Sequence, residues 1–209
     1  MRTIARALLC LFAAFLLGSA HGQEAMPDAL VKNVTLEVVE LIAKDKEIRG
    51  NRNKLIELID EKVLPHFNFT GMTALAMGQS WNKANAEQKK RLTEEFKILL
   101  VRTYASALAA YAEQKFDFRP LRAKPTDTDV TVNVRVLQPG AQPVPIDYSM
   151  EKTPAGWKVY DVMVGGVSLV ANYRTEFNNT VRDSGIEGLI KILSAKNRTL
   201  EAAGGAQQK

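Results

Sequence analysis

The sequence is poor in the residue types that most enzyme and metal sites require. Of 209 residues, one is a cysteine and two are histidines. Because Cys10 lies in the first apolar run, no disulfide framework, cysteine-ligated zinc site or thiol nucleophile can form in the rest of the chain. No glycine-rich phosphate loop, His-Glu-x-x-His motif or Gly-x-Ser-x-Gly elbow occurs. We therefore predict no catalytic residue, no metal ion and no cofactor.

Two residues remain as candidates for a catalytic role. His66 could act as a general base, and Asp161 could be a buried carboxylate because it lies within an apolar strand. No candidate nucleophile lies near His66 in the sequence. A hydrogen-bonding or structural role is therefore the stronger interpretation for both residues.

The first 22 residues have the pattern of a secretory signal peptide. Arg2 and Arg6 form a positive front, residues 7–17 are apolar, and small residues follow. The apolar run is shorter than the roughly 20 residues that a membrane-spanning helix needs. We therefore predict an exported protein, with a signal peptide at 1–22, one domain at 23–203 and a flexible tail at 204–209.

The basic character of the chain is weak once this segment is set aside. The formal net charge of +5 falls to +3 without residues 1–22, which carry two arginines and no acidic residue. A nucleic-acid-binding protein usually gathers lysine and arginine on one face, whereas here they alternate with acidic residues along the chain. We predict no nucleic-acid partner.

Apolar residues recur at helical spacing in the first half of the chain. This spacing predicts helices over 27–48, 53–65, 72–77 and 86–112. In the last of these, Asn85 and Gln88 have the spacing of a loose capping box. Its apolar stripe consists of Leu92, Phe96, Leu99, Leu100, Tyr104, Leu108 and Tyr111.

The apolar period then changes from 3.6 to 2. It predicts strands over 116–119, 130–136, 144–150 and 157–164, joined by turn-rich segments as a four-stranded antiparallel meander. Ser168 can start a further helix that Gly185 ends, and a last helix follows over 186–201. The predicted fold class is α+β, with N-terminal helices, the meander sheet and C-terminal helices packed on one sheet face.

Composition does not distinguish a filled core from a hollow one. The helices and the sheet all supply large apolar side chains to the interior. Two hypotheses from different classes therefore remain. One is an exported structural or adaptor domain with a filled core and no ligand, and the other is a protein that encloses a lipid.

Four segments resemble a known family. They are VLPHFNF (63–69), LLVRTYASAL (99–108), PVPIDY (143–148) and WKVYDVMVGGVSLVANYRTEF (157–177). These segments are similar to those of the MlaC family, which are periplasmic phospholipid carriers of the Gram-negative pathway that maintains lipid asymmetry, also called toluene-tolerance auxiliary substrate-binding proteins. Asn68 and Gly165 depart from the family pattern, since each stands where an acidic residue is expected.

The resemblance implies a strongly twisted sheet and helices around a deep apolar pocket. In this family the pocket takes the acyl tails of a phospholipid, so the only expected ligand is a phospholipid. The implied location is the periplasm. The implied partners are an inner-membrane ABC transporter complex with an MCE-domain protein and an outer-membrane lipoprotein–porin complex. We expect the carrier to be a monomer.

The expected lipid-binding residues come from three elements that would surround this pocket. The inward positions of the sheet are Val132, Val134, Ile146, Tyr148, Tyr160 and Val162. The long helix contributes Phe96, Leu100 and Tyr104, and the helix after the sheet contributes Val170, Tyr173 and Phe177.

Overall fold

The structure, a computed structural model, describes residues 26–124 and 126–206. The expected signal peptide lies outside the described residues, and so do residues 207–209 of the expected tail. The α-helices are α1 (Pro27–Lys44), α2 (Lys46–Gly50), α3 (Arg52–Lys62), α4 (Phe69–Met77), α5 (Ala86–Tyr111) and α6 (Arg174–Ala206). The 3-10 helices are η1 (Leu64–His66), η2 (Gly78–Lys83) and η3 (Ala171–Tyr173). The strands are β1 (Lys115–Phe118), β2 (Asp129–Leu137), β3 (Val144–Thr153), β4 (Gly156–Val164) and β5 (Val167–Ser168).

The strands form one open antiparallel sheet in the order β1-β2-β3-β4-β5. The predicted meander is therefore confirmed and extended by a fifth strand of two residues. This strand was not predicted, because two residues are too few to show a period. It follows a tight turn at Gly165 and Gly166, whose φ angles of 60° and 83° lie in the left-handed region that favours glycine.

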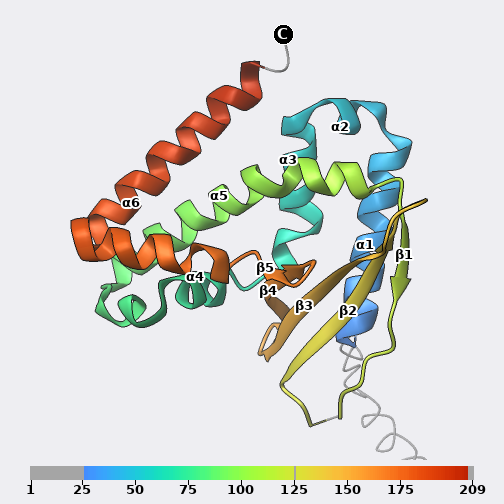
Figure 1. Cartoon of the computed structure of the whole chain (residues 1–209), viewed down its shortest axis with the longest axis horizontal. Helices are drawn as coiled ribbons and strands as arrows, with labels where there is room; N and C mark the ends of the chain where they lie inside the picture. The colour runs from blue at the N-terminus through green and yellow to red at the C-terminus, as the bar shows by residue number, and fades with distance from the viewer. Residues whose placement is uncertain (1–25, 125, 207–209) are drawn as a thin grey trace, which may run out of the picture.

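Helices cover one face of the sheet and continue beyond its end (Figure 1). Helix α1 runs behind the strands, and α5 crosses above the upper end of the sheet from one side of the molecule to the other. On the far side from α1, α4 and the first part of α6 pack around the beginning of α5. Helix α5 is 26 residues long, or about 40 Å, so it connects the two parts of the molecule.

Side-chain caps decide where several helices begin. The predicted capping box is present at α5, where Asn85 accepts a bond from the Gln88 backbone N–H at 2.8 Å and Gln88 bonds back to Asn85. The helix predicted over 27–48 is instead two helices, because Asp45 leaves helical geometry and its carboxylate caps α2. The helix predicted to start at Ser168 is instead divided: Ser168 accepts a bond from the Ala171 N–H at 2.8 Å, the 3-10 helix η3 follows, and α6 begins only at Arg174.

Helix α6 changes direction at Gly185, as the sequence predicted. The glycine has φ 69° and ψ 179°, so it separates two helical halves. The second half extends to Ala206, so it includes the first three residues of the segment expected as a tail. It lies along α5, and its buried residues Leu189, Ile190 and Leu193 belong to the helical core.

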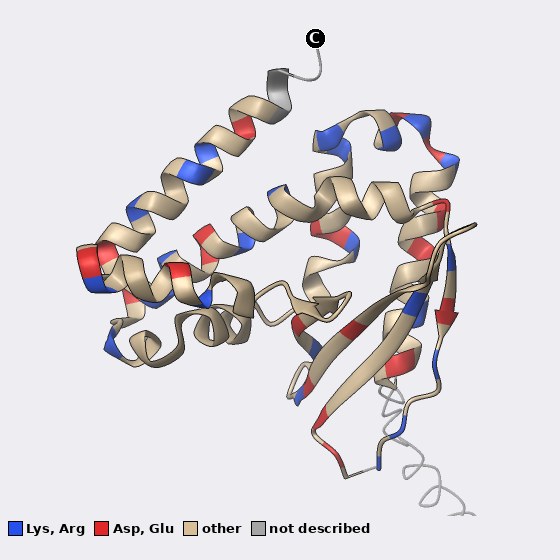
Figure 2. Ribbon diagram, viewed as in Figure 1, with Lys and Arg blue, Asp and Glu red and all other residues tan. Residues whose placement is uncertain are grey.

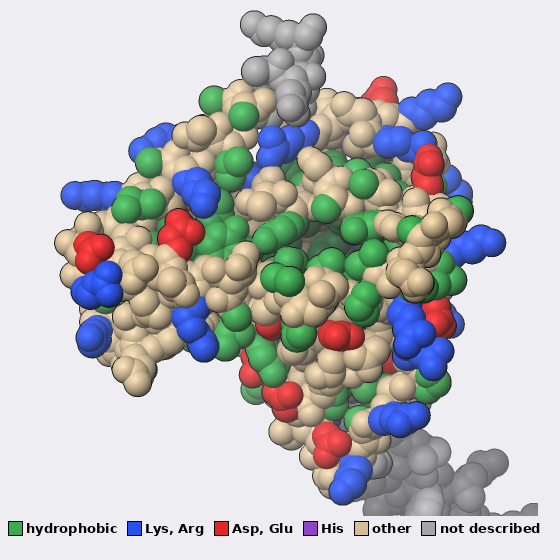
Figure 3. All heavy atoms as spheres, in the orientation of Figure 1, with side chains coloured by type: hydrophobic (Ala, Val, Ile, Leu, Met, Phe, Trp, Pro, Cys, Tyr) green, Lys and Arg blue, Asp and Glu red, His purple; other side chains and the backbone are tan. Residues whose placement is uncertain are grey.

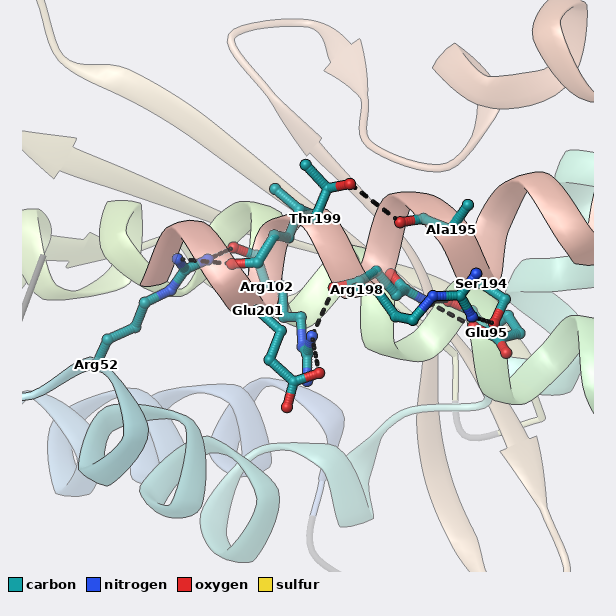
Figure 4. Close-up of polar contacts among 10 residues, drawn as sticks. Arg52, Glu95, Arg102, Ser194, Ala195, Arg198, Thr199 and Glu201 are labelled. Carbon is teal, nitrogen blue, oxygen red and sulfur yellow. Dashed lines mark hydrogen bonds and ion pairs between the residues drawn. The ribbon is translucent and has the colours of Figure 1, made fainter. Parts of the chain in front are cut away.

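Polar contacts attach the end of α6 to α3 and α5 (Figure 4). Arg102 donates to the Asn197 carbonyl at 2.6 Å and pairs with Glu201 at 3.1 Å. Arg52 donates to the carbonyl of Arg102 at 2.6 Å. The buried Asn197 side chain donates to the carbonyl and the carboxylate of Glu95. Arg52 also donates to the Leu200 carbonyl at 3.4 Å, so two arginines and one amide join the three helices.

Charges of both signs are spread over the described elements. Figure 2 shows lysine, arginine, aspartate and glutamate interspersed on most helices and on the sheet. Several of these charges form surface pairs, such as Arg91 with Glu187 at 3.0 Å and Arg49 with Glu113 at 2.6 Å. Among the helices that the structure describes, none combines the length and the apolar character of a membrane span.

The capping box of α5 gives a first prediction. Asn85→Ala removes the side chain that accepts a bond from the Gln88 N–H, so the free energy of unfolding should fall by about 1 kcal/mol. Urea titration measures this loss. Asn82→Ala is the matched control, because Asn82 is exposed in the same region and the described structure gives it no side-chain hydrogen bond. An equal effect of the two substitutions would contradict the role of the cap.

Candidate functional site

A cavity of about 250 Å³ lies between the inner face of the sheet and helices α1, α3 and α5. Figure 3 shows hydrophobic side chains around a hollow on the face where α5 passes above the sheet. Nearly all of the lining is hydrocarbon. The helical wall consists of Leu30, Val31, Val34, Thr35, Val38, Ile59, Val63, Leu64, His66, Phe67, Phe69, Met72, Leu100, Val101, Tyr104, Ala105, Leu108 and Tyr111. The wall on the sheet side consists of Phe116, Ile146, Tyr148, Met150, Val159, Val162 and Leu169.

Helical and strand periods explain why these elements supply apolar walls. In α1, Val31, Val34 and Val38 are spaced by three and four residues and therefore lie on one helix face. In the second half of α5, Leu100, Tyr104 and Leu108 are spaced by four residues and also lie on one helix face. In β3, Ile146, Tyr148 and Met150 alternate and therefore share the inner sheet face. The helices remain far enough from the sheet to leave the cavity between these walls.

A β-bulge changes which residues of β4 face the cavity. The pairing of β3 with β4 shifts between Ser149 and Met150, which lie opposite Asp161 and Val159, so Tyr160 is the extra residue. Val159 and Val162 both line the cavity as a result. The prediction that Tyr160 points inward is wrong, because strict alternation does not hold across a bulge. Its hydroxyl instead donates to Asp129 at 3.0 Å, on the opposite face.

The structure brings five of the expected site residues to the cavity wall. They are Leu100 and Tyr104 of α5, Ile146 and Tyr148 of β3, and Val162 of β4. Val132 and Val134 lie on the same sheet face and are buried, but they pack within the sheet core and do not line the cavity. Which of these side chains contact a ligand stays a prediction.

The remaining expected residues lie in a filled helical core rather than at the cavity. Phe96 contacts Tyr173 and Phe177 with ring centroids 5.1 Å apart in both pairs, and the latter two rings are 5.6 Å apart. Val170 is fully buried in the same cluster. The expectation that these four line the pocket is therefore wrong. The three aromatic rings pack against one another, and Val170 is buried beside them in the same cluster.

Sequence reasoning missed the contribution of the first helix. The stripe of α1 was recognised, but nothing in the sequence placed it opposite β3 rather than in an ordinary core. A weak signal was available in Thr35, which lies beside this apolar stripe and faces the cavity. Leu108 and Tyr111 were likewise recognised as members of the α5 stripe and not assigned to the pocket.

Few polar groups reach the cavity. The Thr35 side chain approaches the Tyr148 hydroxyl as a hydrogen-bond partner. Burial raises the pKa of Tyr148 to about 12, an effect that Thr35 partly offsets, so this hydroxyl stays protonated at physiological pH. Burial is also the main cause that lowers the pKa of His66, and the nearby Lys158 ammonium adds to it.

Asp161, one of the two residues considered for a catalytic role, is held by backbone hydrogen bonds. Asp161 is 7% exposed, and its carboxylate accepts bonds from the backbone N–H groups of Val162 at 2.8 Å and Val170 at 3.4 Å. It thereby ties β4 to the chain that leaves β5. Within the described residues, no three histidine, aspartate or glutamate side chains gather as a metal site would require.

A second cavity, of about 460 Å³, lies between α3 and α5. It is larger but has a mixed lining, because Asp60, Glu94, Lys97 and Arg102 take part in its wall together with Ile56, Leu64, Phe69, Ile98 and Val101. Leu64, Phe69 and Val101 also line the first cavity. A purely apolar ligand is therefore better matched by the first cavity, since burying charged groups beside hydrocarbon is costly.

The fold and its apolar cavity can now be compared with known proteins. The family described as MlaC protein matches residues 32–195. The chain belongs to the MlaC family. A phospholipid-binding protein from Ralstonia solanacearum, solved in complex with a phospholipid, is 38% identical, has a TM-score of 0.78, and the match covers 85% of this chain and 99% of that one.

Two curated MlaC relatives are more distant in sequence. The toluene tolerance protein ttg2D of Pseudomonas putida is 28% identical over 182 residues, which cover 86% of this chain and 83% of the relative. The intermembrane phospholipid transport system binding protein MlaC of Haemophilus influenzae is 24% identical over 181 residues, 85% of each chain. The predicted family and the predicted α+β class are thus confirmed.

The two departures from the MlaC pattern lie at turns beside the sheet. Asn68 caps α4 by accepting a bond from the Gly71 N–H at 2.9 Å, and its amide donates to Glu151 at 2.5 Å. An acidic residue at this position could accept the same capping bond but could not donate to Glu151. Gly165 lies in the β4–β5 turn with open space around it.

The difference between the cavity and the filled core can be tested with one pair of substitutions. In Val170→Trp the indole has no space, so the free energy of unfolding should fall by about 1–3 kcal/mol or more. In Val34→Trp the indole can enter the cavity, so stability should change little while uptake of a neutral apolar fluorescent probe falls. Urea unfolding and probe titration measure the two effects. Equal destabilisation by both substitutions would contradict the assignment of empty space beside Val34.

The lowered pKa of His66 predicts a pH dependence of stability. Because the folded state resists protonating His66 while the unfolded state takes up a proton near the ordinary pKa of 6.5, stability is fully present above that pH. It should then fall as the pH drops through the lower pKa of the folded protein. His66→Gln should flatten this part of the curve, as measured by urea unfolding between about pH 7.5 and pH 5. Identical curves for both proteins would exclude this contribution.

Proposed function

We propose that this protein is a soluble periplasmic phospholipid carrier that encloses acyl tails and shuttles lipid between membrane complexes. The observation that carries the proposal is the apolar cavity between α1, α5 and the sheet. It occurs in an MlaC member whose relative from Ralstonia solanacearum was solved with a phospholipid. An apolar cavity of roughly 150 Å³ already stays dry and takes up benzene, so the present cavity suits hydrocarbon.

The energetics of hydrocarbon explain why a carrier needs an enclosed site. Each buried CH₂ group is worth about 0.8 kcal/mol, so exposing a tail of roughly 16 carbons costs on the order of 12 kcal/mol. A shallow groove would leave much of this penalty in place. Binding of the tails needs no catalytic residue, metal or nucleotide, which is consistent with the poverty of the sequence in such groups.

The proposed route links the two membranes of a Gram-negative cell. The positive front and apolar run of residues 1–17 support export to the periplasm. The family resemblance supports two partners, an inner-membrane ABC transporter complex with an MCE-domain protein and an outer-membrane lipoprotein–porin complex. The proposed ligand is therefore a phospholipid that the carrier exchanges with both complexes to maintain lipid asymmetry of the outer membrane.

An adaptor domain with a filled core is the alternative function. It would explain the folded helices but gives no reason for the cavity. For a closed cavity the cost is about 24 cal/mol per Å³, so an unfilled apolar space of this size lowers stability by at most about 6 kcal/mol. Such a cost is easier to understand if a ligand normally fills the space.

The carrier and the adaptor predict different contents of the purified protein. Organic extraction after export in a Gram-negative host, followed by mass spectrometry, should yield stoichiometric diacyl phospholipid, and removing the lipid should lower the thermal midpoint. Val34→Trp should carry less lipid and lose less midpoint on extraction. Lipid-free protein whose midpoint does not respond to added phospholipid would favour the adaptor.

A further inference from the structure

One pair of hydroxyl groups faces the cavity where the neighbouring wall is hydrocarbon. Thr35 projects from α1 between Val34 and Val38, and all three line the cavity. Tyr148 projects from the middle of β3, between Ile146 and Met150 on the inner sheet face. The two residues therefore come from different walls of the cavity, one from a helix and one from the sheet, and their side chains are hydrogen-bond partners.

The position of Tyr148 in the sheet directs its side chain into the cavity. It lies opposite Val132 on β2 and Val162 on β4, and both neighbours belong to the apolar core of the sheet. Neither neighbour can accept a hydrogen bond through its side chain. The backbone groups of the strands are already used in the ladder, so a partner for the hydroxyl must come from across the cavity.

One of the two hydroxyl protons of Thr35 and Tyr148 has no acceptor within the part of the protein that the structure describes. Each of the two hydroxyls carries one O–H donor, and a bond between them uses one of the two. If Thr35 donates to the Tyr148 oxygen, the Tyr148 O–H remains available, and no other side chain among the described residues accepts it. Because the phenol stays protonated, this donor is present throughout the physiological pH range.

Two other polar side chains at the cavity, Tyr104 and His66, differ in this respect, whereas Tyr111 brings a further hydroxyl group to the wall from the end of α5. The Tyr104 hydroxyl is near the Tyr173 hydroxyl, which serves as its hydrogen-bond partner. His66 lies near Lys158, whose ammonium donates to the Pro65 carbonyl at 2.5 Å. The Thr35–Tyr148 pair is thus a neutral donor surrounded by hydrocarbon, which matches a neutral acceptor on the ligand.

We infer that Thr35 and Tyr148 form a hydrogen-bonding subsite for an ester carbonyl oxygen of the bound lipid. The inference rests on the proposed function. The ester carbonyls are the neutral acceptors of a diacyl phospholipid that lie next to its tails, whereas the phosphate would bring a charge into an apolar space. The subsite selects ester-linked chains over ether-linked chains, because an ether-linked chain lacks the carbonyl and leaves the Tyr148 donor unpaired.

A competition between two matched lipids tests this subsite. Delipidated protein is offered equal amounts of a diacyl and a dialkyl phospholipid with the same headgroup and the same chain length, and the bound ratio is read by mass spectrometry. The wild type should favour the ester lipid by about two- to tenfold, which is the effect of one hydrogen bond. Tyr148→Phe should bring the ratio close to one, and Thr35→Val should lower it less.

The matched control is Tyr160→Phe, which removes a hydroxyl from the opposite sheet face and should keep the wild-type ratio. Because the ratio is independent of the total lipid bound, Thr35→Val still tests the subsite if Tyr148→Phe folds poorly. Equal binding of the two lipids by the wild type would overturn the subsite and leave the carrier function standing. A preference lost in Tyr111→Phe but kept in Tyr148→Phe would also overturn it. Failure to bind either lipid would instead refute the proposed function.

Discussion

Incomplete packing between α1, α5 and the inner face of the sheet is the constraint on which the rest of this structure depends. Each wall is apolar, so water gains little by entering, yet the walls do not close on one another. Something must hold them apart. The length of α5 does so at one side, because its capped N-terminal half is fixed in a separate helical core while its second half spans the cavity.

Some apolar residues of the molecule therefore form a filled core, and others line the open cavity. The ring of Phe96 packs edge to face against Tyr173 and Phe177, which are tilted relative to each other, and the three rings fill the space between α4, α5 and α6. Hydrogen bonds from Arg52 to the Leu200 carbonyl and from Arg102 to the Asn197 carbonyl then attach the end of α6. This filled half allows the other half to keep an open space without loss of the fold.

Much of the fold was predictable because it follows from local periods. The helical stripe of α5, the capping box at Asn85 and the kink at Gly185 were all visible in the sequence and were confirmed. The four long strands were also predicted. The errors arose where one residue changes the period. Asp45 divides a helix because its carboxylate caps the next one, and the bulge at Tyr160 turns Val159 inward in place of Tyr160 while Val162 stays inward.

The sequence by itself determined the α+β class, the elements and their apolar faces, the scarcity of catalytic and metal-ligating residues, and the resemblance to the MlaC family. Only the tertiary structure decided which apolar faces meet in a filled core and which enclose a cavity. An amphipathic stripe has the same pattern in both cases, because burial depends on what packs against it. Thus Val34 and Val170 are both apolar, and only the tertiary packing leaves space beside Val34 on α1 while it buries Val170, just before η3, in a filled core.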